Sequence, residues 1–211
     1  KLGAHPLTVD GKSGTYFAVW APSARQVSVI GNFNHWNAGQ HKLNPRWDES
    51  GIWEGFCENI GKGEAYKFAI ISAHEEYLEK ADPFATYAEV APKTASIIWG
   101  ENYIWKDQEY LNRRKANQHQ PAPMSVYEVH IGSWRRKAED NYRSLSYREL
   151  IDELVPYVKD AGYTHVEFLP IMEHPFFGSW GYQITGYFAS TSRYGEPEDL
   201  MALIDAFHQA G

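Results

Sequence analysis

The chain has 211 residues, of which 43% are hydrophobic, so it can bury a sizeable core in one large or two modest domains. Its net charge of −7 comes without a basic cluster, which argues against a nucleic-acid partner, and no apolar run approaches the roughly 18 residues of a membrane span. The single cysteine, Cys57, excludes an intramolecular disulfide framework and fits a reducing, cytoplasmic compartment.

Aromatic residues are frequent, at 15% of the chain with eight tryptophans. This excess is typical of a protein whose ligand has flat apolar faces and hydroxyl edges, such as a sugar chain. A well-packed β-sandwich core gives the same composition. Composition alone therefore leaves both interpretations open.

The first half of the chain alternates between short strand-like segments and turns. Strands are predicted at residues 15–20, 26–33, 51–58, 65–71 and 95–100. Several short strands without an intervening helix predict an immunoglobulin-like β-sandwich, which we assign to residues 1–105. Residues 61–64, GKGE, are predicted to form a hairpin turn, and residues 74–82, HEEYLEKAD, a solvated charged turn.

Residues 106–123 form a polar connector that ends in two prolines, and the pattern then changes. After a strand at 125–131, Ser146 and Glu149 make a capping box at the start of a helix. Pro156 should bend this helix and Gly162 should end it. Its apolar face consists of Leu150, Ile151, Leu154, Val155 and Val158.

A second strand, at residues 164–169, leads into the segment PIMEHPFFGSWGYQITGYFASTSRYG, residues 170–195. This segment places Phe, Phe, Trp, Tyr, Tyr and Phe among glycines without a helical period, which is typical of a surface built for contact. A second amphipathic helix follows, with Leu200, Leu203, Ile204 and Phe207 on one face. Strand, helix, strand, helix predicts that residues 124–211 are the first two β/α units of a truncated (β/α)8 TIM barrel, in which the aromatic segment is an active-site loop.

Several motifs resemble a known family. YEVHIGSW (127–134), LSYREL (145–150), the loop at 170–195 and LIDAFHQAG (203–211) resemble the start of the catalytic barrel of 1,4-α-glucan branching enzymes, in the α-amylase superfamily. FAVWAP (17–22), VSVIGNFNHW (27–36) and KADPFA (80–85) resemble the glucan-binding sandwich that precedes this barrel. The run EHPFFGSWGYQ is the most specific, whereas Ser190 departs from the family's usual proline.

The resemblance implies a retaining double displacement on α-1,4-glucans such as glycogen, amylose and maltooligosaccharides. An aspartate attacks the α-1,4 bond, a glutamate serves as acid and then base, and a glucan 6-hydroxyl resolves the intermediate into an α-1,6 branch. Retention requires two carboxyl groups about 5–5.5 Å apart. In the family these lie on later barrel strands, beyond residue 211, so we assign no catalytic residue here and expect residues 1–211 alone to be inactive. No cofactor or metal is implied.

The resemblance also implies substrate-binding residues. Tyr182 matches the family's aromatic residue that stacks under the sugar at the cleavage site, although a packed loop anchor is the alternative. Trp180 and Gln183 either shape the same subsite or serve packing. In the sandwich, Trp36 and Lys67 match positions that stack on and hydrogen-bond a maltooligosaccharide, and Tyr77 offers a further platform. The alternative for the sandwich is that it only braces the barrel.

Other chemical signals are weaker. Glu128 and His130 share one face of the first barrel strand, and Glu173 and His174 follow the second. Because no metal-ligand spacing accompanies them, we interpret both pairs as groups that orient loops. Cys57 is interpreted as inert packing.

Two other functions remain open. One is a glucan debranching or trehalose-forming relative, which shares the sandwich and barrel. The other is a non-catalytic α-glucan-binding module, against which stands the exposed surface of a half-barrel. We therefore expect the sequence to be a portion of a longer enzyme.

Overall fold

The structure is a computed structural model, and it describes residues 1–117 and 121–211. The chain divides into two compact units. Unit 1 contains Lys1–Gly100, Met172–Phe177 and Gln183–Ser190, and unit 2 contains Glu101–Ile171, Gly178–Tyr182 and Thr191–Gly211.

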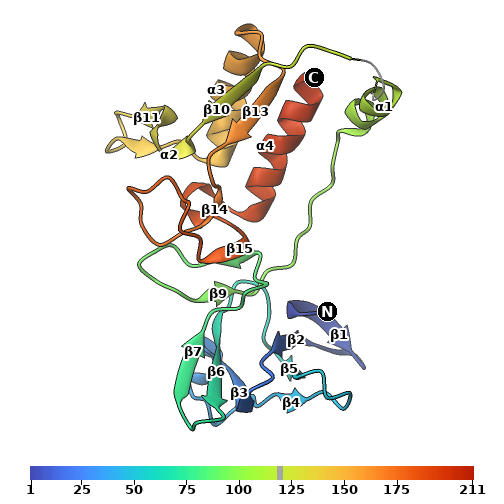
Figure 1. Cartoon of the computed structure of the whole chain (residues 1–211), viewed down its shortest axis with the longest axis vertical. Coiled ribbons are helices and arrows are strands. Elements are labelled where there is room, and N and C mark those ends of the chain that lie inside the picture. The colour runs from blue at the N-terminus through green and yellow to red at the C-terminus, as the bar shows by residue number, and fades with distance from the viewer. Residues whose placement is uncertain (118–120) are drawn as a thin grey trace. The chain divides into compact units, whose positions relative to one another are not determined.

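Unit 1 contains two antiparallel sheets (Figure 1). Sheet A has the order β1 (Gly3–Val9), β2 (Lys12–Trp20), β5 (Ile52–Glu58) and β4 (Asn44–Pro45). Sheet B has the order β3 (Ala24–Gly31), β6 (Ala65–Ser72), β9 (Ser96–Ile97) and β8 (Tyr87–Ala88), and β7 (Tyr77–Lys80) also pairs with β6. A short 3-10 helix, η1 (Asn32–Asn34), follows β3. The predicted β-sandwich is confirmed.

The core of unit 1 lies between the two sheets and follows from the alternation of side chains along the strands. Phe17 on β2 and Phe68 on β6 have no exposed surface, and the Phe17 ring lies 5.2 Å from the ring of Tyr66, centre to centre. Cys57 is a buried free thiol on β5, where burial raises its pKa to about 11. This environment agrees with a packing role for Cys57.

Two local predictions in unit 1 are wrong, and strand β1 was not predicted. Residues 77–80 form strand β7 rather than a charged turn, because an edge strand tolerates charged residues on both faces. Residues 61–64 connect β5 of sheet A to β6 of sheet B, so they are not a hairpin turn. Strand β1 gave no clear signal in the sequence, and its Pro6 is tolerated because β1 is an edge strand.

A two-stranded ribbon from the aromatic segment belongs to unit 1. It pairs β14 (Met172–Glu173) with β15 (Gly186–Ser190). β15 lies against β8, and Phe188 stacks on Phe84 with ring centres 5.4 Å apart and planes inclined by 10°. Residues far apart in the sequence therefore meet within this unit.

Unit 2 contains a parallel strand pair with helices alongside (Figure 1). β10 (Val126–Val129) pairs with β13 (His165–Phe168), and α3 (Tyr147–Asp160) connects them and packs on α4 (Pro197–Ala210). The smaller elements are α2 (Ile131–Trp134), β11 (Arg136–Lys137), β12 (Arg143–Ser144) and η2 (Ser192–Tyr194). The predicted start of α3 is confirmed, because Ser146 and Glu149 form a capping box, and Gly162 follows its end with φ +79°.

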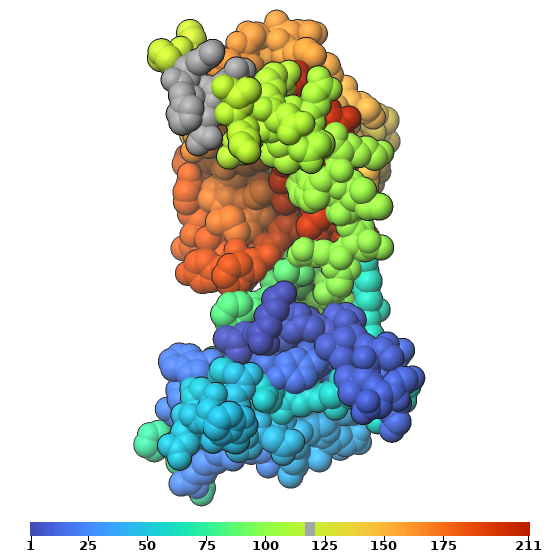
Figure 2. All heavy atoms as spheres, turned by 90° about the vertical axis from the view of Figure 1, so that its right-hand side faces the viewer, coloured from blue at the N-terminus to red at the C-terminus, as the bar shows by residue number. Residues whose placement is uncertain are grey.

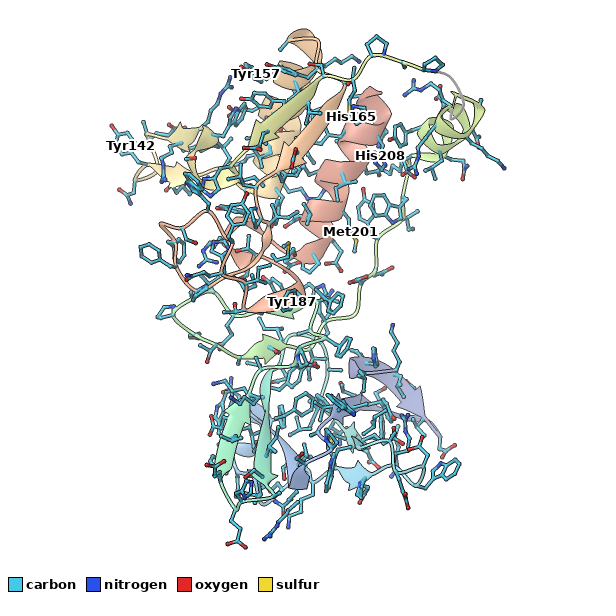
Figure 3. All side chains as sticks on the ribbon, in the orientation of Figure 1. Tyr142, Tyr157, His165, Tyr187, Met201 and His208 are labelled. Atoms are coloured by element: carbon cyan, nitrogen blue, oxygen red, sulfur yellow. The ribbon has the colours of Figure 1, made fainter. Side chains whose placement is uncertain are left out.

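The predicted polar connector contains a helix, α1 (Gln108–Asn117), which covers part of α4 (Figure 2). The His208 ring on α4 stacks on Tyr110 with ring centres 4.2 Å apart (Figure 3). His208 Nδ1 also lies 2.8 Å from the Asp107 carboxylate. None of the helices in the described part of the chain has the length and hydropathy needed to cross a bilayer.

Candidate functional site

Trp36 lies in the tight turn that follows β3. Its indole N–H donates to Asn32 Oδ1 at 3.0 Å, and its main-chain N–H donates to Gly31 O at 2.9 Å. His35 and Trp36 both have left-handed backbone conformations, with φ of 53° and 58°. Such conformations are uncommon for residues other than glycine and persist where the surroundings enforce them. The turn therefore holds Trp36 in one defined, partly exposed position.

Lys67 and Tyr77 share the outer face of sheet B, the face turned away from the core that also carries Ala69 and Ile71. The Lys67 ammonium lies 4.0 Å from Glu79 Oε2, and the Tyr77 hydroxyl donates to Glu79 Oε1 at 3.1 Å. Partial burial and this bond to Glu79 raise the pKa of Tyr77, so the phenol stays protonated at neutral pH. The predicted strand position of Lys67, opposite in orientation to buried Tyr66 and Phe68, is confirmed.

Strand register relates these residues to Trp36. Ile30 pairs with Lys67, and Gly31, which binds the Trp36 main chain, pairs with Tyr66. The Lys67 ammonium group lies on β6 and the Tyr77 phenol lies on β7. The Trp36 indole lies in the turn that follows β3, the strand that pairs with β6. Aromatic faces with adjacent hydrogen-bonding groups suit a ligand with apolar faces and hydroxyl edges.

The aromatic segment exposes its rings to a high degree. Six of its seven large aromatic side chains are between 60% and 72% exposed, with Tyr187 the most open (Figure 3), whereas Tyr194 is buried. The six exposed rings are Phe176, Phe177, Trp180, Tyr182, Tyr187 and Phe188. Residues 174–185, all of which the structure describes, form bends and turns rather than a helix or strand. The prediction of an exposed, non-helical aromatic loop is confirmed for residues 174–185, whereas residues 172–173 and 186–190 of the predicted loop form β14 and β15.

Trp180 and Tyr182 flank Gly181, which has a φ of +86° that favours glycine. The Gly181 N–H donates to Ser179 Oγ at 3.1 Å, which fixes this bend locally. Trp180 and Tyr182 are 67% and 68% exposed and belong to unit 2, whereas Gln183 is exposed and belongs to unit 1. The loop thus presents two rings to solvent from adjacent bends.

Glu173 and His174 are almost fully buried, at 4% and 3% exposed. The Glu173 carboxylate accepts from the His174 main-chain N–H at 3.1 Å, and the Glu173 carbonyl accepts from the Thr185 N–H at 2.8 Å. His174 Nδ1 lies 2.9 Å from Met172 O. These contacts close the base of the aromatic segment, in agreement with the loop-orienting interpretation.

The other carboxylate and histidine pair is differently placed. Glu128 on β10 is exposed, and His130 Nδ1 lies 2.8 Å from Ser133 Oγ at the start of α2. Within residues 1–117 and 121–211, no group of three or more His, Cys, Asp or Glu side chains is arranged to hold a metal ion.

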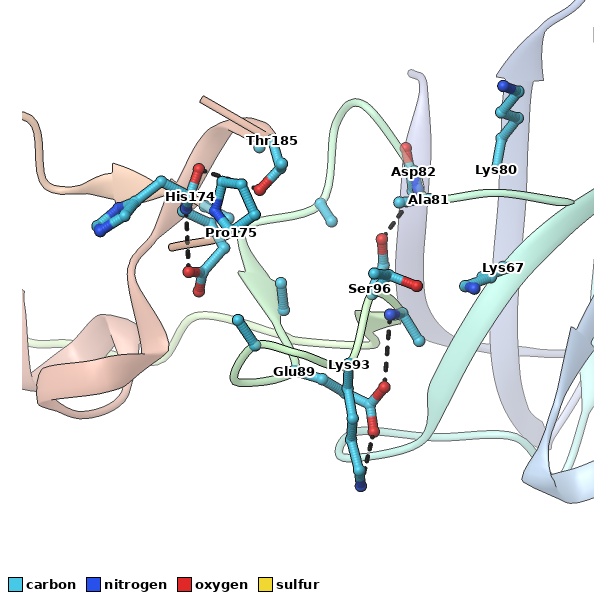
Figure 4. A pocket seen from close by; sticks show the side chains of 18 of the residues that line it. Lys67, Lys80, Ala81, Asp82, Glu89, Lys93, Ser96, His174, Pro175 and Thr185 are labelled. Atoms are coloured by element: carbon cyan, nitrogen blue, oxygen red, sulfur yellow. Dashed lines mark hydrogen bonds and ion pairs between the residues drawn. The ribbon is translucent and has the colours of Figure 1, made fainter. Parts of the chain in front are cut away.

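Unit 1 contains a cavity of about 390 Å³ that the sequence analysis did not predict. Lys67 and Asp82 lie on one side of this cavity, and Pro175 and Thr185 of the β14–β15 ribbon lie on the opposite side (Figure 4). Residues 81–96, rich in alanine, supply much of the remaining wall. Because its two sides lie about 100 residues apart in the sequence, no local pattern could have revealed the cavity.

Comparisons with known proteins identify the sandwich. The family model for carbohydrate-binding module 48, the isoamylase N-terminal domain, matches residues 1–85. A crystal structure of a putative alpha amylase from Salmonella typhimurium superimposes on the whole chain with a TM-score of 0.72 at 22% identity, and the chain covers 31% of it. The structural likeness supports the fold of the chain alone.

Curated relatives match the whole chain. The 1,4-alpha-glucan branching enzyme GlgB of Aquifex aeolicus is 54% identical over 211 residues, and that of Desulfitobacterium hafniense is 55% identical over 212 residues. The chain covers 33% of each, so it spans about a third of the length of the curated relatives it matches. The resemblance of this chain to the 1,4-α-glucan branching enzymes is confirmed over all 211 residues.

Proposed function

We propose that this chain is part of a 1,4-α-glucan branching enzyme, which cleaves α-1,4 bonds of glycogen-type glucans and transfers the chain to a 6-hydroxyl. The observation that carries the proposal is the identity of 54% and 55%, over the full chain, to enzymes with that name. The exposed aromatic loop and the aromatic turn of the sandwich support a saccharide substrate.

In this proposal residues 1–105 form a glucan-binding sandwich, residues 106–123 a linker, and residues 124–211 the first two β/α units of a (β/α)8 barrel. The parallel pairing of β10 with β13, with α3 between them and α4 after them, supports the barrel assignment. The aromatic segment then follows the carboxyl end of the second barrel strand, where barrel enzymes build their active sites.

The proposed chemistry is a retaining double displacement. The aspartate nucleophile and the glutamate acid/base lie in the enzyme beyond residue 211, and this chain supplies groups that bind substrate. Tyr182 stacks under the sugar at the cleaved bond, where its ring gives apolar contact and favours the developing positive charge. Trp180 and Gln183 border the same subsite.

The sandwich binds a second stretch of the same polymer at Trp36, Lys67 and Tyr77. The indole face offers stacking, while the Lys67 ammonium donates to sugar hydroxyls near Glu79. No cofactor is required by this chemistry, and a cytoplasmic location stays a prediction.

The test uses the complete polypeptide that carries this chain, incubated with amylose and assayed for α-1,6 linkages by proton NMR. Tyr182→Ala should lower kcat/KM about 30-fold, which corresponds to the loss of about 2 kcal/mol of contact with a developing cation. Tyr182→Phe should retain most activity, and Tyr187→Ala provides an exposed control. Equal effects of Tyr182→Ala and Tyr187→Ala would count against the stacking role.

The same assay separates the alternatives. A debranching relative releases linear chains from glycogen, a trehalose-forming relative releases disaccharide from the polymer, and a glucan-binding module changes neither substrate. Residues 1–211 alone should form no α-1,6 linkages, and their formation would contradict the placement of the carboxylates beyond this chain.

A further inference from the structure

The cavity of unit 1 is large enough to be a ligand site. Its volume of about 390 Å³ lies within the usual range for ligand pockets, roughly 300–1,000 Å³. It is bounded by the sandwich strands β6 and β7, by residues 81–96, and by the β14–β15 ribbon. Trp36 and Tyr77 do not line the cavity but Lys67 does, so the cavity adjoins the platform proposed above and shares Lys67 with it.

The charges that line the cavity favour a neutral polar ligand. Three lysines and four carboxylates contribute to the wall, and several of them already have partners. Lys93 pairs with Glu89 at 3.2 Å, and Asp82 accepts the Tyr66 hydroxyl at 2.5 Å. The wall thus carries nearly equal numbers of positive and negative groups and no strong net charge that would select an ion, whereas hydroxyl groups can exchange hydrogen bonds with both kinds of partner.

The rest of the wall suits the apolar faces of a sugar ring. Ala85, Ala88 and Ala95 line the cavity together with Pro92 and Pro175. These small side chains leave space that a compact ring can fill, and Thr185 brings a hydroxyl to the opposite side (Figure 4). Apolar walls with a few convergent polar groups are the usual composition of a small-molecule site.

The cavity is continuous with the outer face of sheet B. Lys67 and Glu79 line the cavity, and Glu79 also binds the hydroxyl of Tyr77 on that outer face. We propose that the cavity receives the end of an α-1,4-glucan chain that lies across the outer face of sheet B. This inference rests on the proposed glucan-binding function of the sandwich and adds a terminal subsite to it.

The decisive experiment titrates the isotopically labelled 211-residue chain with maltotriose and follows the main-chain amide signals. The cavity proposal requires shifts in the non-proline residues of 85–96, in 173–174 and in 185–189, in addition to those around Trp36 and Lys67. Shifts confined to the Trp36 turn and the outer face overturn the cavity proposal and leave the platform standing. A titration without any shift overturns both.

A substitution that fills the cavity with a larger side chain provides the second test. Ala88→Phe places a ring in the cavity and should weaken maltotriose binding about tenfold, equivalent to about 1.4 kcal/mol. Ala138→Phe makes the same change at an exposed position of unit 2 and should leave binding unaltered. Unchanged affinity in folded Ala88→Phe contradicts the proposal, and the titration of the unaltered chain decides the question if that variant does not fold.

Discussion

The sandwich of unit 1 and the parallel strand pair of unit 2 bury their strands to different degrees. In β3 and β6 most residues are buried or half-buried, and the fully buried rings of Phe17 and Tyr66 meet between the sheets. In β10 only Val129 is buried, and no residue of β13 is. Helix α3, by contrast, buries Leu150 and Leu154 completely.

The difference shows what stabilises each unit. The sandwich owes its stability to strands that face one another, whereas unit 2 owes it to helix packing around a sheet that is half covered. Parallel sheets are normally covered on both faces. The exposed strand surface of unit 2 therefore supports the proposed barrel assignment, in which both faces of β10 and β13 are covered.

The largest expected loss of stability follows from shortening a buried side chain in the core of the sandwich. Phe17→Ala should lower the free energy of unfolding by about 3–5 kcal/mol, because it leaves a cavity between the sheets. Val166→Ala on half-exposed β13 should lower it by only about 1 kcal/mol. Urea unfolding followed by circular dichroism measures both. Equal losses in the free energy of unfolding would show that the sandwich strands and the parallel strands contribute equally to stability.

A helix-core variant sharpens the contrast within unit 2. Leu154→Ala should cost about 2–5 kcal/mol, since this side chain is fully buried between α3 and its neighbours. Asp152→Ala, on the exposed face of the same helix, should stay within about 0.5 kcal/mol of the unaltered chain. A small loss for Leu154→Ala would show that unit 2 is not stabilised mainly by its helices.

The binding surface of the sandwich can be tested separately from its stability. Trp36→Ala should weaken maltoheptaose binding about tenfold, or about 1.4 kcal/mol, without changing the unfolding midpoint. Trp47→Ala is the matched control, because Trp47 is 91% exposed and lies outside the proposed platform. If calorimetry finds the same affinity for both variants, the bracing role of the sandwich becomes the better explanation.

The smallest effect concerns the ion-pair cluster at the start of α3. Arg143, which contacts both Glu149 carboxylate oxygens at 2.7 and 2.8 Å, and then Lys137 lower the pKa of Glu149. Because the pKa of Glu149 is lower in the folded chain than in the unfolded chain, its carboxylate stabilises the fold at pH values above the unfolded pKa of about 4.3. This stabilisation is lost as the pH falls from that value through the folded-state pKa.

Glu149→Gln should therefore reduce stability at pH 7 by at most about 1 kcal/mol. The difference from the unaltered chain should shrink at pH 3, where the free carboxyl group is largely protonated. Thermal unfolding at the two pH values measures this, and a difference that grows on acidification would reverse the assigned sign.

Helices α3 and α4 of unit 2 were predictable because their signals are local. The Ser146–Glu149 capping box and the apolar faces of α3 and α4 each consist of residues that lie within a few positions of one another in the sequence. Helix α1 was missed because it is mostly polar and has no continuous apolar face, and strand β7 because it is short and two of its four residues are charged. The exposed aromatic loop was predictable from composition. The cavity was not, because its wall depends on tertiary packing of the β14–β15 ribbon against residues 81–96.

The β14–β15 ribbon has a consequence for biosynthesis. Sheet B ends with β9 at Ile97, but unit 1 is complete only when the ribosome has added Ser190, about ninety residues later. At typical rates of 5–20 residues per second, this delay lasts roughly 5–20 s. During that interval the nascent sandwich exposes the surface that β15 and Phe188 later cover, so the cavity is a late product of translation.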